Sequence, residues 1–129
     1  MTIAGLNIIS NAMESLGLNY AFGDYKTEKG QYPPIYYVGE YQEIPSTKET
    51  GEQESQFILT GTTRGTWLAL EETKEKIRSY FNKVSGKTVI VEDGSAVAIF
   101  YANSFVVPTG DAELKRIQIN LDVKEWSVK

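Results

Sequence analysis

The sequence predicts an α+β domain in which two helices pack on one face of a mainly antiparallel sheet. Hydrophobic residues recur at helical spacing in two segments, and β-forming residues dominate several others. The resulting order is a helix, two or three strands, a second helix and three more strands. The chain has 129 residues, the size of a single domain, and shows no internal repeat or linker. We therefore predict one domain over residues 1–129.

The first helix is expected over residues 2–16, where apolar side chains occur every three or four positions and polar ones fill the gaps. Thr2 is suited to cap its start, and Gly17 to end it. A short strand is expected over residues 18–22. Residues 23–31 are polar and contain glycine, so they predict a turn or loop.

Aromatic residues and Val38 predict an extended strand over residues 35–43, which ends near Pro45. Residues 46–55 contain three glutamates, one lysine and no apolar side chain. This composition predicts a solvated loop or hairpin tip, and the alternative is a segment that becomes ordered on a partner. β-Forming residues return at 56–63 and predict the next strand.

The second helix is expected to begin after Thr66, a suitable N-cap, and to run to Phe81. Its apolar residues share one face. Acidic and basic residues on the other face are spaced for i,i+4 ion pairs, which supports a solvent-exposed surface on that side.

Three strands complete the predicted sheet. The dipeptide Asp93-Gly94 separates two β-rich segments, 88–92 and 95–101, and predicts a two-residue hairpin turn. Residues 105–107 extend or follow the second of these strands. Residues 114–123 alternate between apolar and polar side chains, which predicts a strand with one buried face and one wet face.

The composition excludes the commonest catalytic chemistries. The chain contains no cysteine and no histidine, which removes thiolate nucleophiles, cysteine-ligated zinc and the usual Ser-His triads. Its formal net charge is −4, and three of its thirteen basic residues are arginine. Since nucleic-acid binding relies on clustered basic residues, we expect no direct sequence-specific binding to nucleic acid. No segment is typical of a membrane span or an ordinary signal peptide.

Two features resemble ligand sites but are interpreted as structural. Residues 60–66 place glycines between a strand and a helix, yet they lack the spacing of a phosphate-binding loop and predict a turn with a helix cap. The acidic segment 92–94 lacks the ligand spacing of a calcium loop. We therefore predict that the protein is not an enzyme and has no catalytic residue, cofactor or metal. An unmarked Ser/Lys or carboxylate site stays open as the alternative.

Tyrosines gather around the strand predicted at residues 35–43. On a strand, Tyr37 and Tyr41 share one face and Tyr36 takes the other. Tyrosine is common both in half-buried core positions and at protein interfaces, because its ring is apolar and its hydroxyl is polar. Both interpretations remain open from the sequence.

Two long runs carry a family resemblance: residues 61–81 (GTTRGTWLALEETKEKIRSYF) and residues 92–126 (EDGSAVAIFYANSFVVPTGDAELKRIQINLDVKEW). The second run closes the chain with a hairpin, a turn and a long final strand. This layout resembles the tail terminator family, the tail-completion or tail-to-head joining proteins of long-tailed bacteriophages and prophages. The resemblance spans most of the chain and is one of layout.

The resemblance implies a structural subunit that forms a homo-oligomeric ring, commonly hexameric, on the end of the tail tube. Such a ring stops tail growth and offers a surface to the head. The implied partners are the tail tube protein and head connector proteins. The implied locations are the host cytoplasm during assembly and the head-tail junction of the virion tail.

The strand at 35–43 and the loop at 46–55 are expected to supply ring or tube contacts, because they combine amphipathic aromatics with a segment that has little to bury. The candidate contact residues are Tyr36, Tyr37, Tyr41, Lys48, Glu49, Glu52, Glu54 and Arg64. The alternatives are a head-tail neck or minor capsid protein, and further a small bacterial binding module or a carboxylate-based enzyme.

Overall fold

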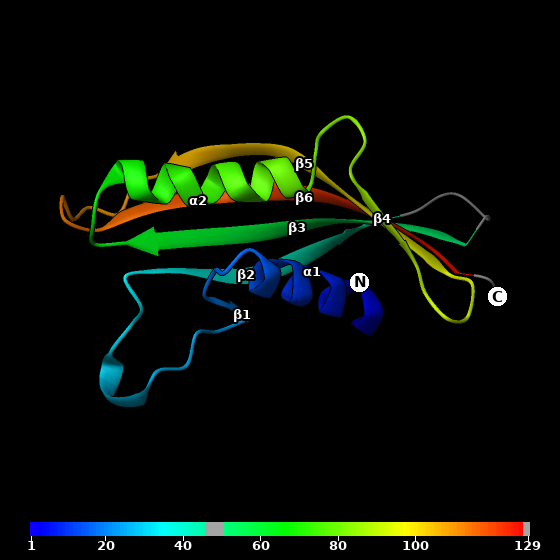
Figure 1. The fold of residues 1–129 in the computed structure, drawn as a ribbon, viewed down its shortest axis with the longest axis horizontal. Coiled ribbons are helices and arrows are strands. Elements are labelled where there is room, and N and C mark those ends of the chain that lie inside the picture. Colours follow the sequence, from blue (N-terminus) through cyan, green and yellow to red (C-terminus); the bar gives the residue numbers. More distant parts are fainter. Residues whose placement is uncertain (46–50, 128–129) are drawn as a thin grey trace.

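The structure is a computed structural model that describes residues 1–45 and 51–127. Its elements follow the predicted order (Figure 1). They are α1 (Ile3–Ser15), β1 (Tyr20–Phe22), the 3-10 turn η1 (Glu28–Gly30), β2 (Ile35–Ile44), β3 (Glu52–Thr63), α2 (Trp67–Tyr80), β4 (Lys87–Ile90), β5 (Ala96–Val107) and β6 (Lys115–Trp126). The prediction of an α+β fold is confirmed.

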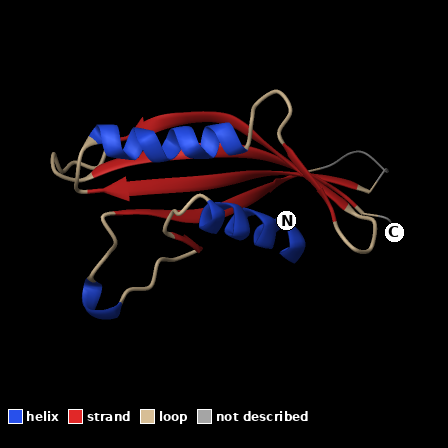
Figure 2. Ribbon diagram, in the orientation of Figure 1, coloured by secondary structure: helices blue, strands red, loops and turns tan. Residues whose placement is uncertain are grey.

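The six strands form one sheet in the order β1-β2-β3-β6-β5-β4. β1 pairs with β2 in parallel, and the other four pairings are antiparallel, so the sheet is mixed. The long strands twist across the molecule; in the view of Figure 2, α2 lies over the central strands, and α1 overlaps β2 at one end and otherwise lies below the strands. Each helix buries apolar residues in the same core cluster as the strands.

The core follows from the alternation along the two central strands. Phe57 and Leu59 of β3 lie opposite Leu121 and Ile119 of β6, and all four side chains are fully buried. Ile77 of α2 is also fully buried and belongs to the same cluster. Burying large apolar side chains of this kind is the main stabilising term of such a domain.

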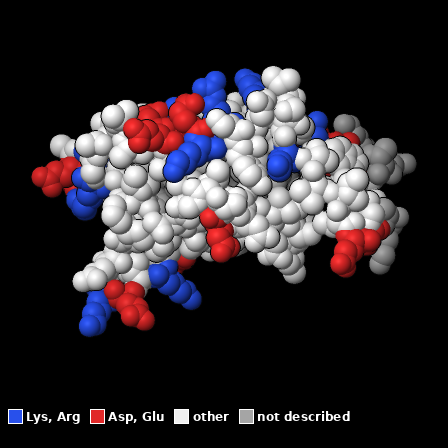
Figure 3. Space-filling view, in the orientation of Figure 1, with Lys and Arg blue, Asp and Glu red and all other residues white. Residues whose placement is uncertain are grey.

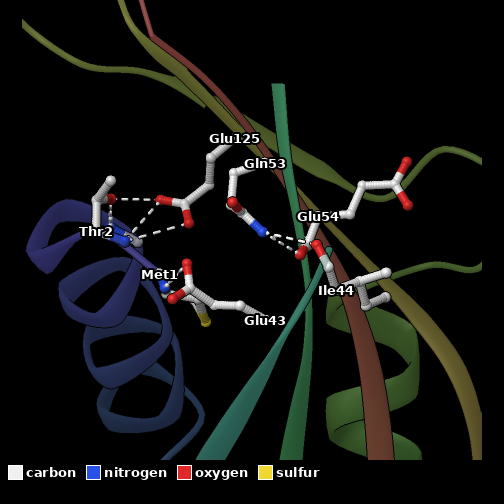
Figure 4. A network of polar contacts seen from close by, with 8 residues as sticks. Met1, Thr2, Glu43, Ile44, Gln53, Glu54 and Glu125 are labelled. Carbon is white, nitrogen blue, oxygen red and sulfur yellow. Dashed lines mark hydrogen bonds and ion pairs between the residues drawn. The ribbon is translucent and has the colours of Figure 1, made fainter. Parts of the chain in front are cut away.

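The first turn of α1 is fastened to the end of β6 (Figure 4). Thr2 caps the helix, since its hydroxyl accepts a hydrogen bond from the Gly5 N–H at 3.0 Å. The carboxylate of Glu125 accepts hydrogen bonds from the Thr2 N–H, at 3.1 and 3.2 Å, and from the Thr2 hydroxyl. Beside it, the Met1 amino group lies 3.4 Å from a carboxylate oxygen of Glu43. The predicted cap at Thr2 is confirmed.

Strand β3 begins earlier than predicted. Residues 52–55 all pair with β6, where Glu52 lies opposite Trp126, and residues 54–55 also pair with β2, where Glu54 lies opposite Ile44. The prediction of a loop is therefore wrong for these four residues, because two neighbouring strands order a segment whose side chains are polar. The remainder of that predicted loop, residues 46–50, lies outside the described residues.

The connection between β4 and β5 is longer than the predicted two-residue turn. It comprises residues 91–95, in which the Val91 N–H donates to the Ser95 carbonyl at 2.8 Å. The Asp93 carboxylate accepts from the Ser95 N–H at 2.8 Å, and Gly94 has a φ of 87°. The position of the turn was predicted correctly, and its length was not.

Tyr37 ties β2 to α2 through the core. Its side chain is fully buried, and its hydroxyl donates to the Thr73 hydroxyl at 2.7 Å, because Thr73 uses its own hydrogen on the Leu70 carbonyl. Thr73 in turn donates to the Leu70 carbonyl at 2.7 Å. Burial raises the pKa of Tyr37 to about 12, because the phenolate loses hydration there.

Replacing Tyr37 by phenylalanine is expected to flatten the fall of stability at alkaline pH. The folded-state pKa of Tyr37 lies above its unfolded value. Its contribution to the free energy of unfolding is therefore present in full below pH 10 and is lost as the pH rises from about 10 to about 12. The free energy of unfolding of the native chain then falls by roughly 1.4 kcal/mol per pH unit from this group alone. Urea unfolding at pH 9 and pH 11 measures the difference.

Tyr32→Phe is the matched control, since Tyr32 is 53% exposed. At neutral pH the Tyr37→Phe variant is expected to lose about 1 kcal/mol with its hydrogen bond. Equal pH dependence in native and Tyr37→Phe chains would contradict this account of the buried hydroxyl.

Candidate protein-protein interface

The residues predicted to form contacts fall into two groups at opposite ends of β3. Glu52 and Glu54 lie at its start, and Arg64 directly follows its end. A strand of this length spans roughly 36 Å, so these residues do not form one surface. Lys48 and Glu49 lie outside the described residues.

The prediction that Tyr37 contributes to a contact surface is wrong. Its side chain is fully buried within the folded chain and bonded to α2, so it offers no atom to a partner. The predicted alternation is nevertheless present. Tyr41, on the same face of β2 but near its end, is 36% exposed.

A cluster of three tyrosines lies at the start of β2. The ring centroid of Tyr36 is 4.8 Å from that of Tyr32 and 5.2 Å from that of Tyr25. Tyr25 and Tyr32 come from the segment between β1 and β2, which extends away from the body of the molecule and carries η1 (Figure 1). Tyr36 was predicted from the sequence as a contact residue, whereas Tyr25 was not, because it stands alone in a polar run and forms no pattern.

Tyr36 and Arg64 line the same cleft of about 390 Å³, together with Tyr32, Pro34, Thr62 and Leu114. The guanidinium of Arg64 lies 3.4 Å from the carboxylate of Asp111. Hydrogen bonding from the Glu113 backbone, with a smaller contribution from Arg64, lowers the pKa of Asp111. A cleft lined by tyrosine, proline and one arginine side chain suits contact with another protein, since aromatic residues and arginine are enriched at protein interfaces.

A separate aromatic ridge lies on β1 and β2. The rings of Phe22 and Tyr41 stack with centroids 6.0 Å apart, and Phe22 continues to the buried Phe57 at 6.3 Å. Phe22 is 48% exposed, and Ile44 at the end of β2 is 43% exposed. Phe22 was not predictable as a surface residue, because it lies at the end of a three-residue strand with no periodic pattern.

The charges of the described residues do not gather into a site for a metal ion. No group of three or more acidic side chains within residues 1–45 and 51–127 is placed to hold one. The acids of α2 lie beside basic residues (Figure 3), with Lys74 paired to Glu71 and Arg78 lying 3.6 Å from Glu75. Neither helix of the described chain is long and apolar enough to cross a membrane.

Comparison with known proteins gives a similarity of fold. No protein-family model matches the chain, and no curated protein matches its sequence. Among solved structures, the fold is similar to a chain in the virion of a native gene transfer agent particle, with a TM-score of 0.67. The match covers 96% of this chain and 90% of that chain, at 10% sequence identity. The architecture is therefore shared along nearly the whole length of both chains.

Proposed function

We propose that this chain is a structural protein of a phage-like virion, and that within the virion it acts as a tail terminator. The observation that carries the proposal is the match, over nearly the full length of both chains, to a virion chain of a gene transfer agent, which is a phage-like particle. The independent resemblance of residues 61–81 and 92–126 to tail terminators supports the same class.

In this role the chain forms a ring, commonly of six subunits, on the end of the tail tube. The ring ends tail growth and presents a surface to head connector proteins, first in the host cytoplasm and then in the finished virion. The work is done by binding to proteins and not by catalysis. Two exposed aromatic surfaces, the cleft at Tyr36 and Arg64 and the ridge of Phe22 and Tyr41, favour such a role, since a ring on a tube has to contact several proteins at once.

A head-tail neck or minor capsid protein is the second candidate. The similar chain belongs to a virion, and its description does not distinguish these positions from the tail end. The two candidates differ in what happens when the protein is missing. A neck protein acts after tails have been completed, whereas a terminator acts while they are being built.

Removing the gene from the genome that encodes the chain, followed by electron microscopy of the particles, separates the candidates. A tail terminator is expected to leave tails of uncontrolled length that are not joined to heads. A neck protein leaves tails of normal length that fail to join. Normal joined particles would contradict both. Supplying the gene in trans is the control that ties the defect to this chain.

A further inference from the structure

Both edges of the sheet are covered by a neighbouring strand along only part of their length. β1 pairs with β2 at Tyr37–Gly39, and β4 pairs with β5 at Ala96–Ile99. Beyond these pairings, toward the C-terminal end of each strand, residues 40–44 of β2 and 103–107 of β5 have no strand beside them in the described part of the chain. We call these two stretches the β2 open edge and the β5 open edge.

The hydrogen bonds at the covered parts show which backbone groups point outward. The Tyr37 N–H donates to the Asn19 carbonyl at 2.8 Å, and the Gly39 carbonyl accepts from the Gly23 N–H at 2.7 Å. The backbone N–H and carbonyl groups of the odd-numbered residues of β2 therefore point away from β3. On the β2 open edge these are Tyr41 and Glu43, whose backbone groups have no partner among the described residues.

The hydrogen bonds of β5 identify the outward-pointing backbone groups of the β5 open edge in the same way. The Tyr101 N–H donates to the Phe81 carbonyl at 2.7 Å, and this is the last backbone bond on that side of β5 among the described residues. A bulge between Tyr101 and Asn103 shifts the register by one residue. Beyond the bulge, the backbone N–H and carbonyl groups of Ser104 and Val106 point outward, away from β6.

Both open edges also expose apolar side chains. Tyr41 and Ile44 on the β2 open edge are 36% and 43% exposed, and Phe105 and Val106 on the β5 open edge are 51% and 53% exposed. Unpaired strand edges with exposed apolar residues are templates for pairing with another chain. Proteins that remain monomeric usually protect such edges with charges, proline or a covering element.

The two open edges are complementary in direction and in shape. Three successive antiparallel pairings separate β2 from β5, so β5 runs opposite to β2. A second copy in the same orientation therefore brings its β2 antiparallel to β5. Each open edge is the C-terminal part of its strand and has five residues. When these parts overlap, β4 of one copy and β1 of the other lie beyond opposite ends of the overlap and do not collide.

We infer that the β5 open edge pairs with the β2 open edge of a second copy of this chain, which joins the sheets of neighbouring subunits head to tail. The inference rests on the proposed function and specifies how its ring is built. The two contact surfaces differ, so the interface is heterologous and closes into a ring by rotation. Because pairing at the strand ends offsets each copy along its strands, the strands of the ring tilt as in a barrel.

Two proline substitutions test the pairing, because proline removes an N–H that only a second copy uses. Val106→Pro blocks the β5 open edge and Glu43→Pro blocks the β2 open edge, while neither removes a backbone hydrogen bond within the described chain. Glu43→Pro and Glu43→Ala both remove the ion pair with the Met1 amino group, so the comparison between them isolates the backbone N–H. Val106→Ala and Glu43→Ala are the matched controls, since they keep the N–H. Circular dichroism and urea unfolding confirm that each variant is folded.

Light scattering after size-exclusion chromatography gives the decisive readout. The native chain and both alanine variants are expected to form oligomers, and each proline variant alone to be a monomer of 14.4 kDa. A mixture of the two proline variants is expected to give a 1:1 dimer, because each variant keeps the edge that the other lacks. Two-fold pairing of β5 with β5 would instead leave Glu43→Pro dimeric on its own and would overturn the inference.

Two further results separate this inference from the proposed function. Oligomers of native mass in both proline variants would overturn the edge pairing and leave a ring built through other surfaces. A native chain that stays monomeric at every protein and salt concentration would overturn the edge pairing and the ring together. Tail-length control can then still be scored in particles, independently of both results.

Discussion

Replacing Gly61 by alanine is expected to lower the free energy of unfolding by about 3 kcal/mol, at the upper end of the range for overpacked cores. A Cβ atom at this position would lie 2.5 Å from the Tyr37 ring, far inside van der Waals contact. The ring has no room to retreat, because its side chain is fully buried and its hydroxyl is bonded to Thr73. Urea unfolding at neutral pH measures the loss.

The control and the second variant locate the cause. Gly65→Ala adds the same methyl group just beyond the end of β3, where it would meet only the Thr63 hydroxyl at 3.3 Å, and is expected to change stability by less than about 0.5 kcal/mol. Tyr37→Leu removes the obstructing ring, so Gly61→Ala is expected to be milder in that background. Additive losses in the double variant would show that the ring is not what excludes the methyl group.

Replacing Glu125 by alanine is expected to lower the free energy of unfolding by about 2 to 3 kcal/mol. Glu125 is 5% exposed and its carboxylate accepts the hydrogen bonds from Thr2 that hold α1 against β6 (Figure 4). Hydrogen bonds to charged groups contribute about 1.5 to 3 kcal/mol, and an acid beside a helix N-terminus adds a fraction of 1 kcal/mol. Asp122→Ala, an exposed change on the same strand, is the matched control.

Hydrogen exchange distinguishes local from global loss in this variant. If Glu125 acts by anchoring the first turn of α1, the amides of that turn lose protection more strongly than those of β3 and β6. Glu125→Gln, which keeps the shape and one acceptor oxygen, is expected to lose about half as much stability. A Glu125→Ala chain as stable as the Asp122→Ala chain would contradict the anchoring role.

Local chemistry explains why much of the fold was predictable. Thr2 and Thr66 both cap their helices as expected, the latter by accepting from the Ala69 N–H at 3.1 Å. The alternation in β6 correctly predicted which of its faces is buried, from Ile117 to Val123. These features depend on a few neighbouring residues, and the sequence contains all of that information. The prediction of a wet opposite face is wrong at Asn120, which is buried and donates to the Asn103 side chain at 2.7 Å.

Features that depend on distant neighbours were missed. The parallel pairing of β1 with β2 and the strand character of residues 52–55 are imposed by strands far along the chain. The burial of Tyr37 depends on α2, and nothing in the local pattern separates it from the partly exposed Tyr41. The candidate surfaces were therefore predicted only in part: Tyr36 and Arg64 share a cleft, and Glu54 lies at the other end of β3.

The length distribution of tails assembled without this protein tests the central proposal most directly. If the chain ends tail growth, electron micrographs of particles lacking it will show a broad distribution that extends beyond the normal tail length. Supplying the native chain will restore a single narrow peak. A narrow peak at normal length in the absence of the protein would contradict the proposed role as a tail terminator.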